Sequence, residues 1–388
     1  MSAAIAFLVT HLMGSGHLVR IRAIARAAAR RGARVVILSG GRPLPHLGAP
    51  DVPFVQLPWV MADGLDYRRL LDPDGRPVDA AFRARMLAAA QAALAAFRPD
   101  ILVTETWPFG RGALRAEYAA LAEAARQTGA RRVVSLRDIP EPPGRAGKLA
   151  RAVRDLAGFD LVLVHGPQGF HDLLADWPLP PGLRNLLRWT GFVAEPLPPP
   201  RPGAEVLVAA GSGVAGRELM RIAAAAARLS PRPWRILVGG SDAARFAAGL
   251  PGPARAEPVR ADYRARLAGA AASVSLAGYG TVTDLLQCAT PAVLVPMTEA
   301  GQHEQRLRAA ALAAHGFAVA DPAALDPVGL AAAVEAAIAR GPRPPAGLAL
   351  DGAARSADIL LDLGGGRRGA PRGFDAPAGR APRRGAQE

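Results

Sequence analysis

Ala277-Gly278-Tyr279-Gly280-Thr281-Val282-Thr283-Asp284 is the stretch on which the interpretation of this chain depends. An apolar run ends at Ala277, and two glycines then permit a tight turn before residues that suit the start of a helix. Residues 291–296 follow as a second buried strand, and Glu304-Gln305 opens the next expected helix. We expect the two strand ends to direct backbone N–H groups, a hydroxyl and carboxylates toward one crevice. A ligand that combines phosphate and polyol groups would use all of them.

The composition bounds the class of protein. A chain of 388 residues can form two domains with separate cores, and half of its residues are apolar. No apolar run reaches the roughly 20 residues that a membrane span needs. The run 3–9 has no basic segment before it and is expected to be a first strand rather than a signal peptide. The single cysteine, Cys288, excludes an intrachain disulfide and fits a reducing cytoplasm, so we expect a cytoplasmic protein.

The formal net charge of +14 is carried almost entirely by arginine, because Lys148 is the only lysine. These arginines are scattered and aromatic residues are few, so the sequence does not predict a nucleic-acid partner. The alternative is that the basic residues form a surface that binds anionic lipid headgroups. Peripheral contact with the inner face of the membrane is therefore retained as an alternative to a purely soluble state.

Buried strands alternate with amphipathic helices over the first 190 residues or so. The strands are short apolar runs without strict alternation, as expected for a parallel sheet that is covered on both faces. The expected strands are 3–10, 33–39, 52–57, 100–105, 132–137 and 160–165. The expected helices are 17–31, 78–97, 113–128 and 147–156.

A proline-rich segment interrupts this alternation. Residues 195–202 contain five prolines in eight residues, which indicates a stiff extended linker. A second alternating series follows, with strands expected at 205–210, 235–238, 273–276, 292–295 and 318–320. Its helices are expected at 216–229, 243–249, 263–270, 281–289, 304–315 and 327–340.

These patterns predict an α/β protein of two doubly wound, Rossmann-like domains that face each other across a cleft. We place the N-terminal domain at residues 1–194, the linker at 195–203 and the C-terminal domain at 204–363. Glycine, proline and arginine dominate from residue 364, so 364–388 is expected to be a disordered tail. In open sheets of this kind a ligand binds at the carboxyl ends of the strands.

Gly14-Ser15-Gly16-His17 follows the first expected strand. A dinucleotide-binding fingerprint would require a small residue at Val19 and an acid at the end of the next strand, and this chain has neither, so a nicotinamide cofactor is rejected. His17 would lie at a helix N-terminus, where the dipole disfavours imidazolium and leaves a neutral base. The alternative is a polar residue that only completes a turn.

Gly211-Ser212-Gly213 resembles the start of a Walker phosphate loop, but Arg217 and Glu218 stand where that loop needs lysine and a hydroxyl. An NTPase is therefore not expected. A turn of this composition can still hold a diphosphate through backbone N–H groups and Ser212. The alternative is an ordinary connection between strand and helix.

Thr281 and Asp284 have the spacing of a capping box, which would explain both without a ligand. Glu304-Gln305 has a comparable alternative as a solvated helix start. On the N-terminal side, Glu105, Arg137 and Asp138 stand at strand ends beside Trp107 and Phe109, and they are candidates to hold a second substrate.

Two further alternatives concern these N-terminal residues. Arg137 and Asp138 could instead pair with each other, and His165 is expected to be a satisfied buried histidine. We find no metal-ligand spacing and no nucleophile-elbow serine, so no metal is expected.

At these residues the chain resembles the GT-B glycosyltransferases, specifically the family 28 C-terminal-domain (MurG-like) group. That group contains the bacterial enzyme that transfers N-acetylglucosamine to a lipid-linked muramyl peptide. The similarity covers about residues 1–345. It lies in the segments already quoted, 14–17, 211–213, 278–281 and 304–305. Residues 104–111 with 135–139 look closer to an uncharacterised branch of predicted glycosyltransferases.

The resemblance implies a role for each matching residue. His17 would deprotonate an acceptor hydroxyl or position the base, and Gly14, Ser15 and Gly16 would line the acceptor side. Gly211, Ser212 and Gly213 would hold the donor diphosphate, together with the turn Gly278, Tyr279, Gly280 and Thr281. Asp284 stands where the family usually has a ribose-binding glutamate, and Glu304 and Gln305 would contact sugar hydroxyls. Asp284 is one methylene shorter than that glutamate and Glu304 replaces a glutamine, which leaves nucleotide and sugar undecided.

The implied reaction is an inverting, metal-independent transfer of a hexose or N-acetylhexosamine from a nucleotide-diphosphate sugar, with a UDP-sugar favoured. The sugar nucleotide is a co-substrate, so no cofactor is expected. The acceptor is unidentified, and a lipid-linked acceptor is one candidate. Two alternatives remain: a nucleotide-sugar hydrolase on the same fold, and a catalytically inactive nucleotide-sugar-binding protein.

Overall fold

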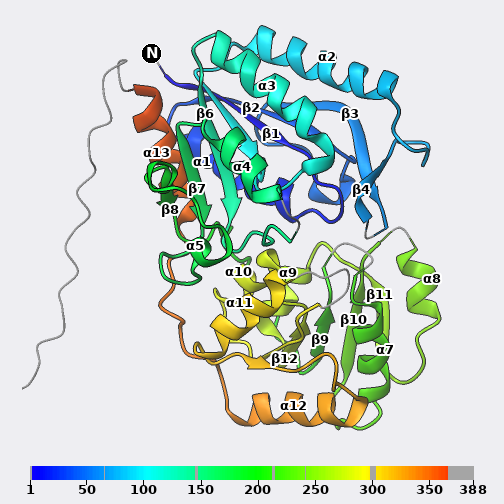
Figure 1. The fold of residues 1–388 in the computed structure, drawn as a ribbon. Helices are drawn as coiled ribbons and strands as arrows, with labels where there is room; N and C mark the ends of the chain where they lie inside the picture. Colours follow the sequence, from blue (N-terminus) through cyan, green and yellow to red (C-terminus); the bar gives the residue numbers. More distant parts are fainter. Residues whose placement is uncertain are drawn as a thin grey trace, which may run out of the picture.

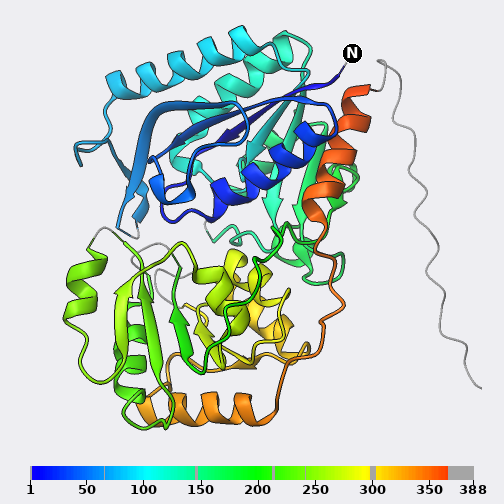
Figure 2. The same ribbon diagram turned by 180° about the vertical axis from the view of Figure 1, so that it is seen from behind.

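The chain forms two domains, each built on its own β-sheet (Figure 1). The computed structural model describes residues 2–64, 66–144, 147–211, 215–240, 242–297 and 303–365, without the side chain of His46. Both sheets are covered by helices on both faces (Figures 1 and 2). The predicted α/β class with two Rossmann-like domains is confirmed.

The N-terminal sheet has eight strands in the order β4-β3-β2-β1-β5-β6-β7-β8. Its strands are β1 (Ala4–Val9), β2 (Arg34–Gly41), β3 (Phe54–Asp63), β4 (Asp66–Leu71), β5 (Ile101–Glu105), β6 (Arg131–Arg137), β7 (Leu161–His165) and β8 (Leu187–Trp189). All pairs are parallel except β3 with β4. Every residue of β1, β5 and β7 is buried, which is why these strands read as continuous apolar runs.

Alternate residues of β1 face opposite layers of helices. Ile5, Phe7 and Val9 pack in one core with α1, whereas Ala6 and Leu8 pack in another with α2 and α3. The N-terminal helices are α1 (Gly16–Arg30), α2 (Ala80–Phe97), α3 (Arg115–Gln127), α4 (Lys148–Leu156), α5 (Leu173–Asp176) and α6 (Pro181–Arg184), with 3-10 turns η1 (Pro45–Leu47) and η2 (Gly112–Leu114). The two-residue period of the strand thus separates the two cores.

The C-terminal sheet has six parallel strands in the order β11-β10-β9-β12-β13-β14. The strands are β9 (Val206–Ala209), β10 (Trp234–Val238), β11 (Arg255–Pro258), β12 (Ala272–Ser275), β13 (Ala292–Leu294) and β14 (Ala318–Val319). The helices are α7 (Arg217–Ala226), α8 (Ala243–Ala248), α9 (Tyr263–Gly269), α10 (Tyr279–Leu285), α11 (Glu304–Ala313) and α12 (Pro327–Ala339). Here α10 and α11 cover one face of β9, and α7 and α12 cover the other.

The last helix corrects the predicted domain boundary. Helix α13 (Gly352–Gly365) returns to the N-terminal domain and packs against α1, where Ala357 and Leu360 are fully buried (Figure 2). Residues up to 363 were expected in the C-terminal domain, and Gly364 and Gly365 in the tail. The apolar face of α13 is visible in the sequence, but nothing in its spacing identifies α1 as its partner. The remaining residues of the expected tail, 366–388, lie outside the described residues.

Three strands were missed: β4, β8 and β11. Strand β3 also runs on to Asp63 and forms a hairpin with β4, and Ala62 N donates to Leu12 O beside the β1–α1 loop. Helix α10 begins at Tyr279 rather than at Thr281. Within the described ranges, no helix has the length and apolarity needed to cross a bilayer.

Candidate active site at the domain interface

His17 lies in the first turn of α1, and its ring contacts a carboxylate at the end of a neighbouring strand. His17 Nδ1 is 2.6 Å from Oε1 of Glu105, the last residue of β5. Strands β1 and β5 are adjacent and parallel, so the loop after β1 and the end of β5 meet at one edge of the sheet. The topology therefore brings together two residues that are 88 positions apart.

Glu105 is fully buried and surrounded by donors. Arg20 Nη2 is 2.5 Å and Thr106 Oγ1 is 2.6 Å from Oε1, while Arg111 Nη2 is 3.1 Å from Oε2. Burial alone would raise the pKa of Glu105, but the imidazole and the two guanidinium groups around it lower that pKa well below its usual range. Glu105 is therefore an ionised acceptor of hydrogen bonds.

His17 is neutral at physiological pH. Burial is the main cause that lowers the pKa of the imidazole from 6.5 to about 3. The negative charge of Glu105 acts to raise this pKa, and the positive charge of Arg111 acts to lower it further. The helix dipole was expected to keep His17 neutral, but desolvation is the main cause. In the neutral ring Nδ1–H donates to Glu105, which leaves the lone pair on Nε2. The side chain is 24% exposed, so the ring is accessible from outside.

The loop before α1 has the backbone expected of a ligand-facing turn. Gly14 has φ of +34°, which an L side chain rarely adopts, and a Cβ at Gly16 would meet nothing within 4 Å. Ser15 is the N-cap residue of α1, and its side chain makes no capping hydrogen bond to the helix. Tyr67 of the β3–β4 hairpin contacts Met13, with 3.9 Å between Oη and Sδ. The hairpin thus borders the loop before α1.

The segment 277–284 forms part of the loop after β12 and most of α10, close to the expected strand end, turn and helix. Its N-cap is Gly278, so the alternative of a capping box at Thr281 and Asp284 is wrong. A Cβ at Gly278 or at Gly280 would meet nothing within 4 Å, so space lies beside this turn.

Tyr279 reaches into the N-terminal domain rather than into that space. Its hydroxyl donates to His165 O at 3.0 Å and accepts from Val193 N at 2.7 Å. Its ring lies 5.2 Å from the guanidinium carbon of Arg20, the residue that contacts Glu105. Tyr279 is therefore part of the contact between the domains.

Asp284, the expected ribose ligand, is paired with an arginine. Arg264 Nε is 2.9 Å and Nη2 is 2.8 Å from Asp284 Oδ1. The same guanidinium donates to the carbonyl groups of Glu195 and Pro196 in the linker. Burial raises the pKa of Asp284 despite the opposing charge of Arg264. Asp284 and the linker are thus joined through one guanidinium.

Glu304 and Gln305 are both buried at the start of α11. Glu304 forms ion pairs with Arg308 and with Arg137, the latter at 3.3 Å. Gln305 Oε1 accepts from Met297 N at 3.1 Å. Neither side chain projects freely toward a sugar in this arrangement.

Arg137 and Asp138 contact the C-terminal domain and do not pair with each other. Arg308 binds both carboxylate oxygens of Asp138, at 2.7 and 2.8 Å, and both side chains are buried. Arg308 Nη1 also donates to Ala277 O at 2.7 Å. Glu141 accepts from the N–H groups that open α11, at His303 and Glu304. The segment after β6 is therefore fixed to α11.

The other expected diphosphate turn is described only at Gly211, which has φ of +88° and open space beside its Cα. Ser212 and Gly213 lie outside the described residues. Arg217, at the position of the Walker lysine, donates to Gly239 O and to Asp242. Arg217 thus holds the loop after β10.

Trp107 and Phe109, expected beside a substrate, are instead buried in the N-terminal core at 3% and 2% exposure. Their apolar rings pack against the aromatic side chains of Tyr118, Phe159 and Trp177. His165 is fully buried between the hydroxyls of Ser135 and Thr190, at 2.7 and 3.0 Å, which confirms the prediction of a satisfied histidine.

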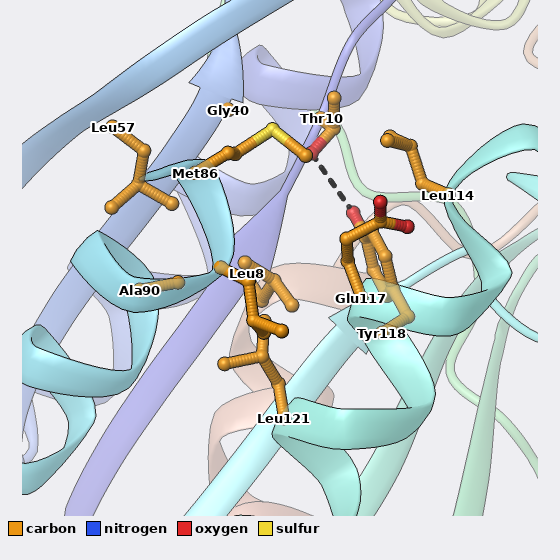
Figure 3. A pocket seen from close by; sticks show the side chains of 11 residues that line it. Leu8, Thr10, Gly40, Leu57, Met86, Ala90, Leu114, Glu117, Tyr118 and Leu121 are labelled. Carbon is orange, nitrogen blue, oxygen red and sulfur yellow. Dashed lines mark hydrogen bonds between the residues drawn. The ribbon is translucent and has the colours of Figure 1, made fainter. Parts of the chain in front are cut away.

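A small apolar pocket lies behind this edge, inside the N-terminal domain (Figure 3). Leu8, Met86 and Leu121 form its walls, and the hydroxyl of Tyr118 donates to Thr10 Oγ1 at 3.1 Å. The pocket contains none of the predicted site residues. Within the described ranges, no group of three or more His, Cys, Asp or Glu side chains is arranged to hold a metal ion.

Several polar residues of this interface were not predicted: Arg20, Arg111, Thr106, Arg308, Glu141 and Arg264. Two carried a readable signal, because Arg20 lies three residues after His17 and Arg308 lies four after Glu304, on the same helix faces. The others approach from separate elements, so their partners depend on tertiary packing.

Comparisons with known proteins agree with this architecture. Residues 238–346 match the sequence profile described as the glycosyltransferase family 28 C-terminal domain. No curated protein matches the chain.

Solved structures of similar fold cover almost the whole chain. The calicheamicin glycosyltransferase CalG4 is 19% identical with a TM-score of 0.56, covering 94% of this chain and 95% of that chain. MurG from Acinetobacter baumannii is 16% identical with a TM-score of 0.53, covering 94% and 99%. Phytolacca americana UGT2, solved with UDP-2fluoro-glucose and pterostilbene, is 16% identical with a TM-score of 0.57, covering 94% and 95%.

At these identities the structural likeness establishes the fold, and the profile match lies in the domain that carries α10 and α11. The chain therefore has the GT-B glycosyltransferase fold, and residues 238–346 of its C-terminal domain match the glycosyltransferase family 28 profile.

Proposed function

We propose that this chain transfers a hexose or N-acetylhexosamine from a nucleotide-diphosphate sugar to an acceptor hydroxyl, with His17 as the general base. The observation that carries the proposal is the His17–Glu105 pair at 2.6 Å, which leaves Nε2 as the free lone pair of an accessible ring. A histidine oriented by a buried carboxylate suits proton removal from a hydroxyl.

In the proposed step the acceptor oxygen forms a bond to the anomeric carbon as the bond from that carbon to the diphosphate oxygen breaks. Attack from the face opposite the leaving group inverts the anomeric configuration. The hydroxyl proton passes to Nε2 of His17, and Glu105 stabilises the resulting imidazolium. Because the imidazole is weakly basic, we expect proton transfer late in C–O bond formation, when the hydroxyl has become acidic.

The donor side is proposed to use backbone rather than a metal ion. Open space at Gly211, Gly278 and Gly280 supports close approach of a diphosphate to main chain at this edge of the sheet. The buried groups around His17 have a net positive charge, because Arg20 and Arg111 carry two positive charges and Glu105 carries one negative charge. An anionic donor would compensate the remaining charge.

The nucleotide is proposed to be uridine diphosphate, with thymidine diphosphate as the competing choice. UGT2 was solved with UDP-2fluoro-glucose, and the spinosyn rhamnosyltransferase SpnG with thymidine diphosphate. Asp284 and Glu304 are candidates for ribose and sugar hydroxyls, but each would have to exchange its arginine partner for the donor. Donor binding would therefore accompany a local rearrangement.

The acceptor remains a hydroxyl compound of unidentified class, with a lipid-linked acceptor and peripheral membrane contact as part of the proposal. Action in the cytoplasm is proposed as well, since nucleotide sugars are charged co-substrates. Vesicle sedimentation with anionic and neutral lipids tests the membrane contact. If the protein sediments with neither anionic nor neutral vesicles, membrane contact is removed from the proposal.

A thermal-shift series with UDP- and TDP-sugars tests the donor. A ligand at 100 times its Kd stabilises the folded state by about 2.7 kcal/mol, which is a measurable shift. If no nucleotide sugar shifts the melt, the donor assignment fails.

Transfer is then tested with radiolabelled donor and candidate hydroxyl acceptors in EDTA, with NMR of the product's anomeric proton. Inverted product formed in EDTA supports the proposal. Rapid release of free sugar without any acceptor would favour the hydrolase, and donor binding without turnover would favour a binding protein.

A further inference from the structure

Arg20 and Tyr279 contact each other across the domain interface. Arg20 belongs to α1 of the N-terminal domain and is only 3% exposed, while Tyr279 is the first residue of α10. The guanidinium carbon lies 5.2 Å from the centroid of the tyrosine ring, within the roughly 6 Å range of a cation–π contact. Figure 1 shows α10 at the top of the C-terminal domain, directly below the N-terminal domain.

The same guanidinium is one of the three donor groups, with Thr106 and Arg111, that hold the carboxylate beside His17. Arg20 Nη2 contacts Glu105 Oε1, the oxygen that also accepts from His17 Nδ1. Arg20 Nη2 is 3.4 Å from His17 Nδ1 as well, and Arg20 Nε is buried without a hydrogen bond. The carboxylate and the tyrosine ring are therefore the principal contacts that restrain the guanidinium. Movement of Arg20 would remove one of the contacts that fix Oε1, the oxygen that orients the imidazole.

Tyr279 is itself held in place. Its hydroxyl has two hydrogen bonds, to His165 O and from Val193 N, and its ring packs at 5.7 Å edge-on to Phe192. The guanidinium carbon of Arg308, from the C-terminal domain, lies 6.0 Å from the ring centroid. The ring thus contacts one arginine from each domain and has little freedom to shift.

We propose that Tyr279 is a positioning residue for the reaction: its ring holds Arg20 against Glu105, so that His17 is correctly oriented only when the two domains are in contact. This role differs from the donor contact expected for Tyr279 from the sequence. It rests on the proposed function only in taking His17 as the base. If the C-terminal domain moved away, Arg20 would lose its aromatic contact, and the His17–Glu105 pair would become less ordered.

The orientation of His17 can be measured without any substrate. Full-length protein labelled with 15N-histidine should show one protonated and one unprotonated ring nitrogen for His17, assigned by loss of the signals in His17→Ala. In Tyr279→Leu both resonances should move toward averaged values, because the tautomer is no longer fixed. Tyr279→Phe keeps the ring against Arg20 but loses the two hydroxyl hydrogen bonds, so its His17 signals should move less than those of Tyr279→Leu.

Kinetics supply the second readout. Tyr279→Leu should lower kcat by about 10- to 100-fold, as expected for a misplaced catalytic group, with donor KM nearly unchanged. Phe170→Leu is the matched control: Phe170 packs edge-on to Phe192 in the same aromatic cluster but makes no recorded contact with Arg20. It should leave the His17 signals and kcat unchanged.

Three results would overturn the inference: unchanged His17 signals in Tyr279→Leu, an equal effect of Phe170→Leu, or a rise in donor KM with kcat unchanged. If Tyr279→Leu does not fold, Arg20→Met breaks the same contact from the other domain and should move the His17 signals alike. Altered signals in a protein that transfers no sugar would support the positioning role while rejecting the proposed function.

Discussion

The two halves of the candidate site differ in how their carboxylates are used. In the N-terminal half, Glu105 takes an arginine on each oxygen and still orients His17, whose Nε2 stays available. In the C-terminal half, Asp284 and Glu304 are each paired with arginine. In the proposed function, the acceptor half is therefore already assembled, whereas a donor would have to replace existing ion pairs of Asp284 and Glu304.

This difference has a physical origin in the domain interface. The hydrogen-bond and ion-pair partners of Glu105 lie within one domain, and the other domain reaches this group only through the contact of the Tyr279 ring with Arg20. Glu304, Arg308, Arg137 and Asp138 bridge the two domains. Their pairing therefore depends on the relative position of the domains, and under the proposed function donor binding would be coupled to that position.

The largest expected effect tests the assembled half. His17→Ala should lower kcat by about 10²- to 10⁴-fold, the usual contribution of a general base, while donor binding in a thermal-shift assay is retained. His171→Ala is the matched control, because His171 Nε2 pairs with Asp176 at 2.6 Å outside the site. Equal loss in both variants would contradict the assignment of His17.

The next effect concerns the bridge between the domains. Asp138→Asn leaves the buried Arg308 charge only partly compensated and should reduce the free energy of unfolding by about 3 kcal/mol, measured by denaturant titration. Asp155→Asn breaks the more exposed pair with Arg115 and should cost less than about 1 kcal/mol. A small effect at Asp138 would show that the pair does not join the domains.

The pH dependence of stability distinguishes the neutral histidine from an exposed one. Since the pKa of His17 is about 3 in the folded state and near 6.5 when unfolded, the unfolded chain binds more protons between these values. Stability should fall as pH drops from 6.5 toward 3, with a contribution of up to about 1.4 kcal/mol per pH unit from this residue. Below the ordinary glutamate pKa, the lowered pKa of Glu105 adds a loss in the same direction.

Chemical denaturation of wild type and His17→Ala from pH 7 to 4 measures this slope. The free energy of unfolding of His17→Ala should change less with pH than that of the wild type between pH 7 and 4. Identical slopes would mean that His17 titrates in the folded protein much as it does in the unfolded chain.

The smallest effect probes the donor half. Gly280→Ala adds a methyl group where no atom lies within 4 Å, so the unliganded fold should be unchanged or stabilised by up to about 1 kcal/mol. Donor binding should weaken, because the methyl group takes up space needed for close approach to the backbone. Gly182→Ala, in α6 with similar open space, should leave donor binding unchanged. Unaltered donor affinity in Gly280→Ala would move the donor away from this turn.

Much of the fold was readable from local pattern. Apolar runs predicted the central strands of both sheets, because such runs are what a doubly covered parallel sheet requires. Edge strands β4 and β11 were missed because their residues are polar and partly exposed, as in Asp66–Leu71. Helix α13 was not predicted, and its residues up to 363 were assigned to the wrong domain, because nothing in the local pattern identifies the surface that they cover.

The sequence by itself determined the two sheets, the linker and the polar residues that stand at strand ends, because each follows from local periodicity or from turn chemistry. Only the tertiary structure decided which charges meet: His17 with Glu105, Asp138 with Arg308, Asp284 with Arg264. These partners are 20 to 170 positions apart in the chain. Their pairing depends on sheet order and on how the two domains pack, which no local pattern in the chain contains.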